Sequence, residues 1–180
     1  MKSLTFILGG ARSGKSNHAL EIAFTYQNVL FIATAQAWDS EMRHRIDVHK
    51  TERPDHWGTL EAPQNVGDAL IQSDYPADCV VLDDMTLLAS NVILALGDDV
   101  DTPTAEKAVL AETEKLIETL ETIDADVVIV SNEVGLGIVP ATKLGRVYRD
   151  ALGRANQRLA KAADSVLFMV SGLPMVVKGN

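Results

Sequence analysis

Eight residues near the start of the chain have the types and spacing needed to bind phosphate. Residues 9–16 read Gly-Gly-Ala-Arg-Ser-Gly-Lys-Ser, a complete G-x-x-x-x-G-K-[ST] phosphate loop. Its glycines let backbone N–H groups converge on phosphate oxygens at the N-terminus of a helix, where the dipole favours anions. The ligand is therefore predicted to be a nucleotide polyphosphate. The predicted phosphate contacts are Gly9, Gly10, Ala11, Arg12, Ser13, Gly14, Lys15 and Ser16.

Two side chains are expected to bind the Mg²⁺ ion that accompanies such a nucleotide. The Ser16 hydroxyl is one, and Lys15 would reach the β- and γ-phosphates. Asp83 is the other, because it ends the apolar run 79–82, where phosphate-loop enzymes place a carboxylate for the Mg²⁺ shell. Asp84 competes for this role, but neighbours along a strand face opposite ways, so only one of them can point at the loop.

A second segment, residues 41–54, is dense in histidine and cationic side chains within an acidic protein. A positive patch near a phosphate loop suggests a second contact to phosphate. His49 follows Met42 and Ile46 at helical spacing, so it could share a face that packs inward. A single histidine in such a place is more often structural than catalytic, and the residues alone leave both interpretations open.

The third segment, residues 131–140, is a glycine-bearing loop that follows an apolar run, and such loops often carry recognition. A predicted helix with four arginines follows it. These polar groups indicate either a binding surface or an ion-paired, solvated helix face.

Short β-branched runs alternate with segments of helical periodicity, which predicts a parallel sheet covered by helices. In such a sheet, ligands bind beyond the carboxyl ends of the strands. We expect an α/β, P-loop NTPase-like (RecA-like) fold with a parallel-rich sheet flanked by helices, and residues 1–180 as a single domain. The predicted strands are 4–8, 29–33, 80–82, 127–130 and 166–170, and the predicted helices are 15–24, 39–51, 87–96, 104–122 and 143–163, with a surface loop at 97–103.

Composition excludes several classes of partner. A formal net charge of -9 argues against nucleic acid or an anionic membrane surface as the partner. The single cysteine, Cys79, lies in an apolar run and is expected to be buried rather than paired. No apolar run has the length of a membrane span and no secretory signal precedes the first strand, so we expect a cytoplasmic protein.

Several stretches resemble the bifunctional adenosylcobinamide kinase/adenosylcobinamide-phosphate guanylyltransferase family. The resemblance runs nearly end to end, and its most specific parts are Asn-Glu-Val-Gly-Leu-Gly-Ile-Val-Pro at 132–140 and Gly-Arg-Ala-Asn-Gln-Arg-Leu at 153–159. It also includes the phosphate loop, Ile-Ala-Thr-Ala-Gln at 32–36, Arg45-Ile46 with His49, and Ser-Gly-Leu-Pro at 171–174.

The resemblance implies two reactions that use GTP or ATP with Mg²⁺. Adenosylcobinamide is first phosphorylated, and GMP from GTP then passes through a guanylyl-histidine to the phosphate of adenosylcobinamide phosphate, giving adenosylcobinamide-GDP and pyrophosphate. By position, the guanylylated histidine is His49, with His44 as an alternative, and Val48 stands where several relatives have a second histidine. The family's further nucleotide contacts fall on Thr34, Ala35, Gln36, Lys50, Thr51, Glu52, Arg53, Glu61 and Asp83. Some relatives have Glu at the position of Asp83. Relatives are homotrimeric, so the resemblance also implies a homo-oligomer.

Two other functions remain compatible with these residues. One is a simple small-molecule kinase in which His49 only contacts phosphate. The other is a non-enzymatic, nucleotide-dependent assembly module that uses the arginine-rich helix as its partner surface.

Overall fold

The computed structural model describes residues 1–36, 53–97 and 99–179. Its seven described strands form one sheet in the order β3-β2-β4-β5-β1-β6-β7. All neighbouring strands pair in parallel except β6 and β7, which form an antiparallel hairpin. The mostly parallel α/β sheet predicted from the sequence is thus confirmed. The strands are β1 (Leu4–Gly9), β2 (Val29–Ala33), β3 (Gly58–Glu61), β4 (Cys79–Asp83), β5 (Asp126–Asn132), β6 (Ser165–Val170) and β7 (Leu173–Lys178).

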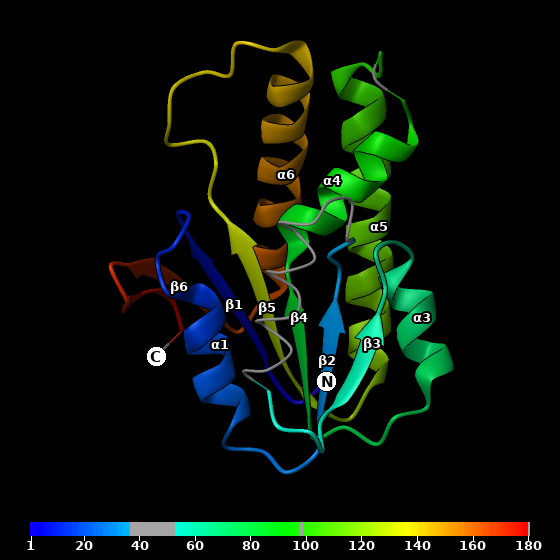
Figure 1. Ribbon diagram of the computed structural model, residues 1–180, viewed down its shortest axis with the longest axis vertical. Coiled ribbons are helices and arrows are strands. Elements are labelled where there is room, and N and C mark those ends of the chain that lie inside the picture. Colours follow the sequence, from blue (N-terminus) through cyan, green and yellow to red (C-terminus); the bar gives the residue numbers. More distant parts are fainter. Residues whose placement is uncertain (37–52, 98, 180) are drawn as a thin grey trace.

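Helices cover both faces of this sheet (Figure 1). One face packs against α1, and the other carries the remaining described helices, with apolar side chains of α3 to α6 in one cluster. Among the described residues, no helix combines the length and the apolar character needed to cross a lipid bilayer. The described helices are α1 (Lys15–Ala23), α3 (Val66–Ser73), α4 (Met85–Ala95), α5 (Thr102–Thr122) and α6 (Lys143–Ala162). The helix expected at 39–51 lies outside the described residues.

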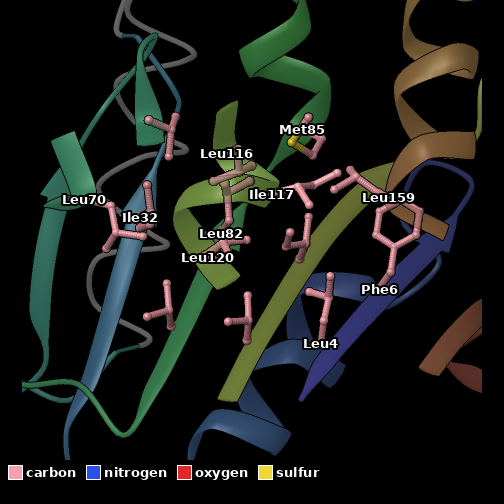
Figure 2. Packing of buried hydrophobic residues seen from close by; sticks show 14 of the residues in the cluster. Leu4, Phe6, Ile32, Leu70, Leu82, Met85, Leu116, Ile117, Leu120 and Leu159 are labelled. Carbon is pink, nitrogen blue, oxygen red and sulfur yellow. The ribbon is translucent and has the colours of Figure 1, made fainter. Parts of the chain in front are cut away.

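The core explains why the central strands are apolar at nearly every position. Leu4 and Phe6 of β1 and Leu82 of β4 belong to one apolar cluster with Leu116 and Leu120 of α5 (Figure 2). Alternate residues of the same strands face α1 instead. A parallel strand covered on both faces has no solvent side, so β-branched and aliphatic residues fill it throughout. Cys79, at the start of β4, is fully buried, as expected.

Three elements were not expected from the sequence: β3, α3 and β7. Residues 171–172, which follow the predicted strand 166–170, form the turn between β6 and β7. The predicted surface loop at 97–103 is also too long, because α5 already begins at Thr102. Asp101 caps that helix by accepting a hydrogen bond from the Thr104 N–H at 2.8 Å, and Pro103 fits in the first turn, where a helix has no need of the missing N–H.

Candidate nucleotide site

Three strands bring the predicted site to one edge of the sheet. The phosphate loop follows β1, Asp83 ends β4, and β5 lies between these two strands. Gly9, the first residue of the loop, pairs with Asn132, the last residue of β5. The loop and the acidic strand end therefore face each other across the carboxyl end of β5. This edge is where ligands bind in open parallel sheets.

The phosphate loop leads directly into α1. Gly14 precedes the helix with φ 94°, and no side chain caps its N-terminus, which leaves the first N–H groups of α1 for an anion. A Cβ at Gly14 would lie 3.1 Å from the Cα of Gly172, so both the dihedral and the close approach require glycine. The Gly172 N–H donates to the Ser13 carbonyl at 2.9 Å, so the β6–β7 turn supports the loop.

Lys15 is held inside this loop. Its ammonium donates to the Gly10 carbonyl at 2.6 Å and lies 3.4 Å from Ser13 Oγ. Only 7% of the residue is exposed, and burial lowers the pKa of the ammonium, while the charges of Asp84 and Asp83 oppose that shift. The cation is therefore positioned beside the loop before any phosphate arrives.

The two adjacent acids at the end of β4 have separate surroundings. Asp83 Oδ1 lies 3.3 Å from Ser16 Oγ, across β5. Asp84 instead caps α4, where its Oδ1 accepts from the Leu87 N–H at 2.9 Å. Burial raises the pKa of Asp84, and hydrogen bonds from Leu87 and Thr86 and the charge of Lys15 act in the opposite direction. The geometry therefore separates a carboxylate that faces the phosphate loop from one that supports a helix.

The donor set fits Mg²⁺. This ion is commonly held by one or two protein oxygens together with phosphate oxygens and water. Ser16 and Asp83 offer a hydroxyl and a carboxylate 3.3 Å apart beside the loop. Within residues 1–36, 53–97 and 99–179 there is no group of three or more His, Cys, Asp or Glu side chains that could bind a metal.

Other predicted nucleotide contacts gather beside Asp83. Ala33 of β2 pairs with Glu61 on one side and with Asp83 on the other. The guanidinium of Arg53 lies 4.1 Å from the centre of the Phe31 ring. Burial lowers the pKa of the Arg53 guanidinium, and the charges of Asp83 and Glu61 act in the opposite direction. These three charged side chains therefore lie near one another at this end of the sheet.

Thr34 follows β2 and is fully buried. Its Oγ1 donates to the Asp84 carbonyl at 2.8 Å and accepts from the Asp84 N–H at 3.0 Å. Its carbonyl accepts from Asn91 Nδ2 at 2.9 Å. The polar groups of Thr34 thus hold the backbone of Asp84, while Ala35 and Gln36 are half-buried beyond it. Four other predicted site residues lie outside the described part of the chain: His49, Lys50, Thr51 and Glu52.

Hydrogen bonds between polar residues of β5, α4 and α6 beside the site were not predicted from the sequence. Ser131 Oγ donates to Asn156 Oδ1 at 2.7 Å, and Asn156 Nδ2 donates to the Asn132 carbonyl at 3.1 Å. Tyr148 Oη, on the same helix, donates to the Thr86 carbonyl at 3.3 Å. The rule that ligands bind at strand ends selected residues 131–133, but the partners on α4 and α6 could be found only from the fold.

Three arginines of α6, the helix that follows the third segment, have partners within the protein. Arg146 donates to the carbonyls of Pro140 and Ala141, both at 2.9 Å. Arg149 pairs with Asp150, and Arg158 pairs with Glu114 of α5. For Arg149 and Arg158 the structure favours the ion-paired helix face over a binding surface, whereas Arg146 binds backbone carbonyls.

The strand order, with β5 between the phosphate-loop strand and the strand that ends in Asp83, defines a P-loop NTPase-like protein of RecA-like topology. Residues 5–177 match the family described as cobinamide kinase / cobinamide phosphate guanyltransferase. The chain belongs to this family.

Three similar proteins are known under closely related names. The bifunctional adenosylcobalamin biosynthesis protein CobU of Escherichia coli (strain K12) is 42% identical, and the protein of the same name from Salmonella typhimurium (strain LT2) is 43% identical. Each alignment covers 97% of this chain and 99% of the relative. The bifunctional adenosylcobalamin biosynthesis protein CobP of Pseudomonas aeruginosa (strain PAO1) is 41% identical, over 97% of this chain and 96% of its own.

Proposed function

We propose that this protein catalyses two reactions, phosphorylation of adenosylcobinamide and transfer of GMP from GTP to the product, in keeping with the cobinamide kinase and cobinamide phosphate guanyltransferase of the family description. One geometric observation supports a nucleotide-dependent transfer: Ser16 Oγ and Asp83 Oδ1 lie 3.3 Å apart beside a buried Lys15. The nearly full-length match to bifunctional relatives favours two activities over a simple kinase or an assembly module.

In the kinase reaction, the phosphate loop and Lys15 bind the nucleotide and stabilise the charge that develops on its phosphates. Phosphoryl transfer depends mostly on such positioning and electrostatic stabilisation. Mg²⁺, held by Ser16 and Asp83, supplies further charge neutralisation when bound. Because the phosphate loop contacts phosphates and not bases, both ATP and GTP are candidate donors.

In the guanylyltransferase reaction, we assign the nucleophile to His49. A neutral imidazole nitrogen attacks the α-phosphorus of GTP, the bond from that phosphorus to the bridging oxygen breaks, and pyrophosphate leaves. The resulting phosphoramidate then transfers GMP to the phosphate of adenosylcobinamide phosphate, so one difficult transfer becomes two easier ones. The remaining predicted nucleotide contacts are part of the proposed binding site for GTP. They are Thr34, Ala35, Gln36, Lys50, Thr51, Glu52, Arg53, Glu61 and Asp83.

A cytoplasmic location and assembly into a homotrimer stay predictions from the sequence and its resemblance.

Intact-mass spectrometry tests the guanylyltransferase half. The wild-type protein, incubated with Mg²⁺ and GTP, is expected to gain the mass of one GMP. His49→Ala is expected to gain none, whereas the matched controls His44→Ala and His56→Ala gain it. An adduct on His49→Ala would refute the assigned nucleophile, and no adduct on any protein would refute this half of the function. Phosphorylated adenosylcobinamide, measured in parallel with ATP and with GTP, tests the kinase half.

A further inference from the structure

Asn132 lies between the two sides of the nucleotide site. It is the last residue of β5 and pairs with Gly9, where the phosphate loop begins. On the other side of β5 is β4, which ends in Asp83. A polyphosphate that contacts Lys15 and the Ser16–Asp83 pair at once must therefore lie over the end of β5. Asn132 is the residue at that end.

Hydrogen bonds fix this asparagine in place. Its backbone N–H and its Nδ2 both donate to Thr86 Oγ1, each at 3.0 Å. Nδ2 also lies 3.4 Å from Asp84 Oδ2. The Asn132 carbonyl accepts from Asn156 Nδ2 of α6 at 3.1 Å. Contacts from α4 and α6 together restrict both its backbone and its side chain.

The chemistry of the partners fixes which way the carboxamide is turned. The carboxylate of Asp84 only accepts hydrogen bonds, so the nitrogen has to face it. Thr86 uses its single hydroxyl proton in its hydrogen bond to Asp84, so its oxygen can only accept from Asn132. The carboxamide nitrogen is thus occupied at the α4 side. The carboxamide oxygen has no hydrogen-bond partner in the part of the chain that the structure describes, and Asn132 is only half-buried.

We propose that Asn132 is a catalytic residue of the kinase reaction, whose Oδ1 accepts a hydrogen bond from the alcohol that receives the phosphoryl group. This role rests on the proposed function. The alcohol oxygen forms the new bond to the terminal phosphorus, the bond to the bridging oxygen breaks, and the nucleoside diphosphate leaves with its electron pair. The alcohol proton is released to water, because an amide oxygen orients a hydroxyl without serving as its base.

A carboxamide suits this position better than a carboxylate. Asp83 and Asp84 already place two acids at the end of β4, and the ligand is itself a polyanion. A third carboxylate would add repulsion, whereas an amide oxygen accepts the same hydrogen bond without charge. The residue thus contributes orientation, which carries much of the catalysis in phosphoryl transfer.

The two half-reactions supply the test, because only one of them uses an alcohol. In Asn132→Ala, phosphorylation of adenosylcobinamide is expected to fall by about a hundredfold in kcat, with the KM for the nucleotide unchanged. Formation of the GMP adduct from GTP should proceed at the wild-type rate, since its acceptor is a histidine. Equal losses in both half-reactions would show that the role of Asn132 is structural and would overturn the proposal. Unimpaired phosphorylation by Asn132→Ala would also overturn it.

Ser131→Ala is the matched control. It removes a buried hydrogen bond to Asn156 but leaves the Asn132 carboxamide intact, so phosphorylation should be retained. Asn132→Ser is a second variant that keeps a polar side chain and the backbone N–H bond to Thr86 Oγ1 but removes the amide oxygen. It should show the same split if Asn132→Ala fails to fold. Absence of phosphorylation by the wild-type protein would refute the proposed kinase function, which distinguishes that failure from the failure of this inference.

Discussion

Thr34→Val tests whether a buried hydroxyl holds the acidic end of β4 in place. The substitution keeps the shape of the side chain and removes both of its hydrogen bonds to Asp84. The Asp84 carbonyl retains the Leu88 N–H at 3.3 Å, but the Asp84 N–H loses its partner, which is the hydroxyl of a fully buried residue. A buried donor left unpaired costs about 1–3 kcal/mol. We therefore expect the free energy of unfolding to fall by about 2 kcal/mol.

Thr113→Val is the matched control for this prediction. Thr113 is also fully buried, but its hydroxyl donates at 2.7 Å to the Val109 carbonyl, which belongs to the regular hydrogen bonding of α5. No backbone group loses its partner there, so the loss should stay below about 1 kcal/mol. Urea unfolding followed by linear extrapolation measures both values. A loss in Thr34→Val no greater than that in Thr113→Val would refute the reasoning.

Two further predictions concern Lys15 and a pair of glycines. Lys15→Met should lower the rates of both transfer reactions by about a thousandfold. The free energy of unfolding should stay the same or rise, because the substitution removes a desolvated ammonium. A clear loss of stability in a thermal melt would contradict this prediction. Gly67→Ala should destabilise the protein by about 1–3 kcal/mol, because its Cβ would lie 2.8 Å from Thr119 Oγ1 and 3.0 Å from the Lys115 carbonyl. Gly153→Ala, in α6 with nothing within 4 Å, should be neutral or stabilising by up to about 1 kcal/mol in the same urea experiment; equal effects of the two alanines would contradict the packing argument.

The central strands could be predicted because their burial on both faces requires apolar residues throughout. The elements that were missed lack this pattern. β3 reads Gly-Thr-Leu-Glu and lies at an edge of the sheet, and β7 contains Pro174 and is exposed along its length. α3 carries Gly67, a poor helix former that is explained by its close approach to α5. Edge position and packing between helices are properties of the fold, so no local rule reveals them.

Some residues of the site could likewise be predicted from the sequence, and others could not. A contiguous motif and the end of an apolar run were enough to single out Lys15, Ser16 and Asp83. The separate surroundings of Asp83 and Asp84 and the hydrogen bonds of Asn132 depend on which strands are neighbours. Sequence periodicity does not give that order. The chemistry assigned to His49 rests on resemblance, and that residue lies outside the described part of the structure.

The position of β1 in the sheet has a consequence for how the protein folds as it is synthesised. The neighbours of β1 are β5 and β6, with Leu4 paired to Val127 and Thr5 to Ser165. The phosphate-loop strand leaves the ribosome before β2, β3 and β4, yet both of its partners leave after them. Such long-range pairing slows folding, because the closure of a large loop must precede any gain from the contacts. The nascent chain can therefore assemble β2, β3 and β4 early, while the segment that binds phosphate stays unpaired until β5 has been synthesised.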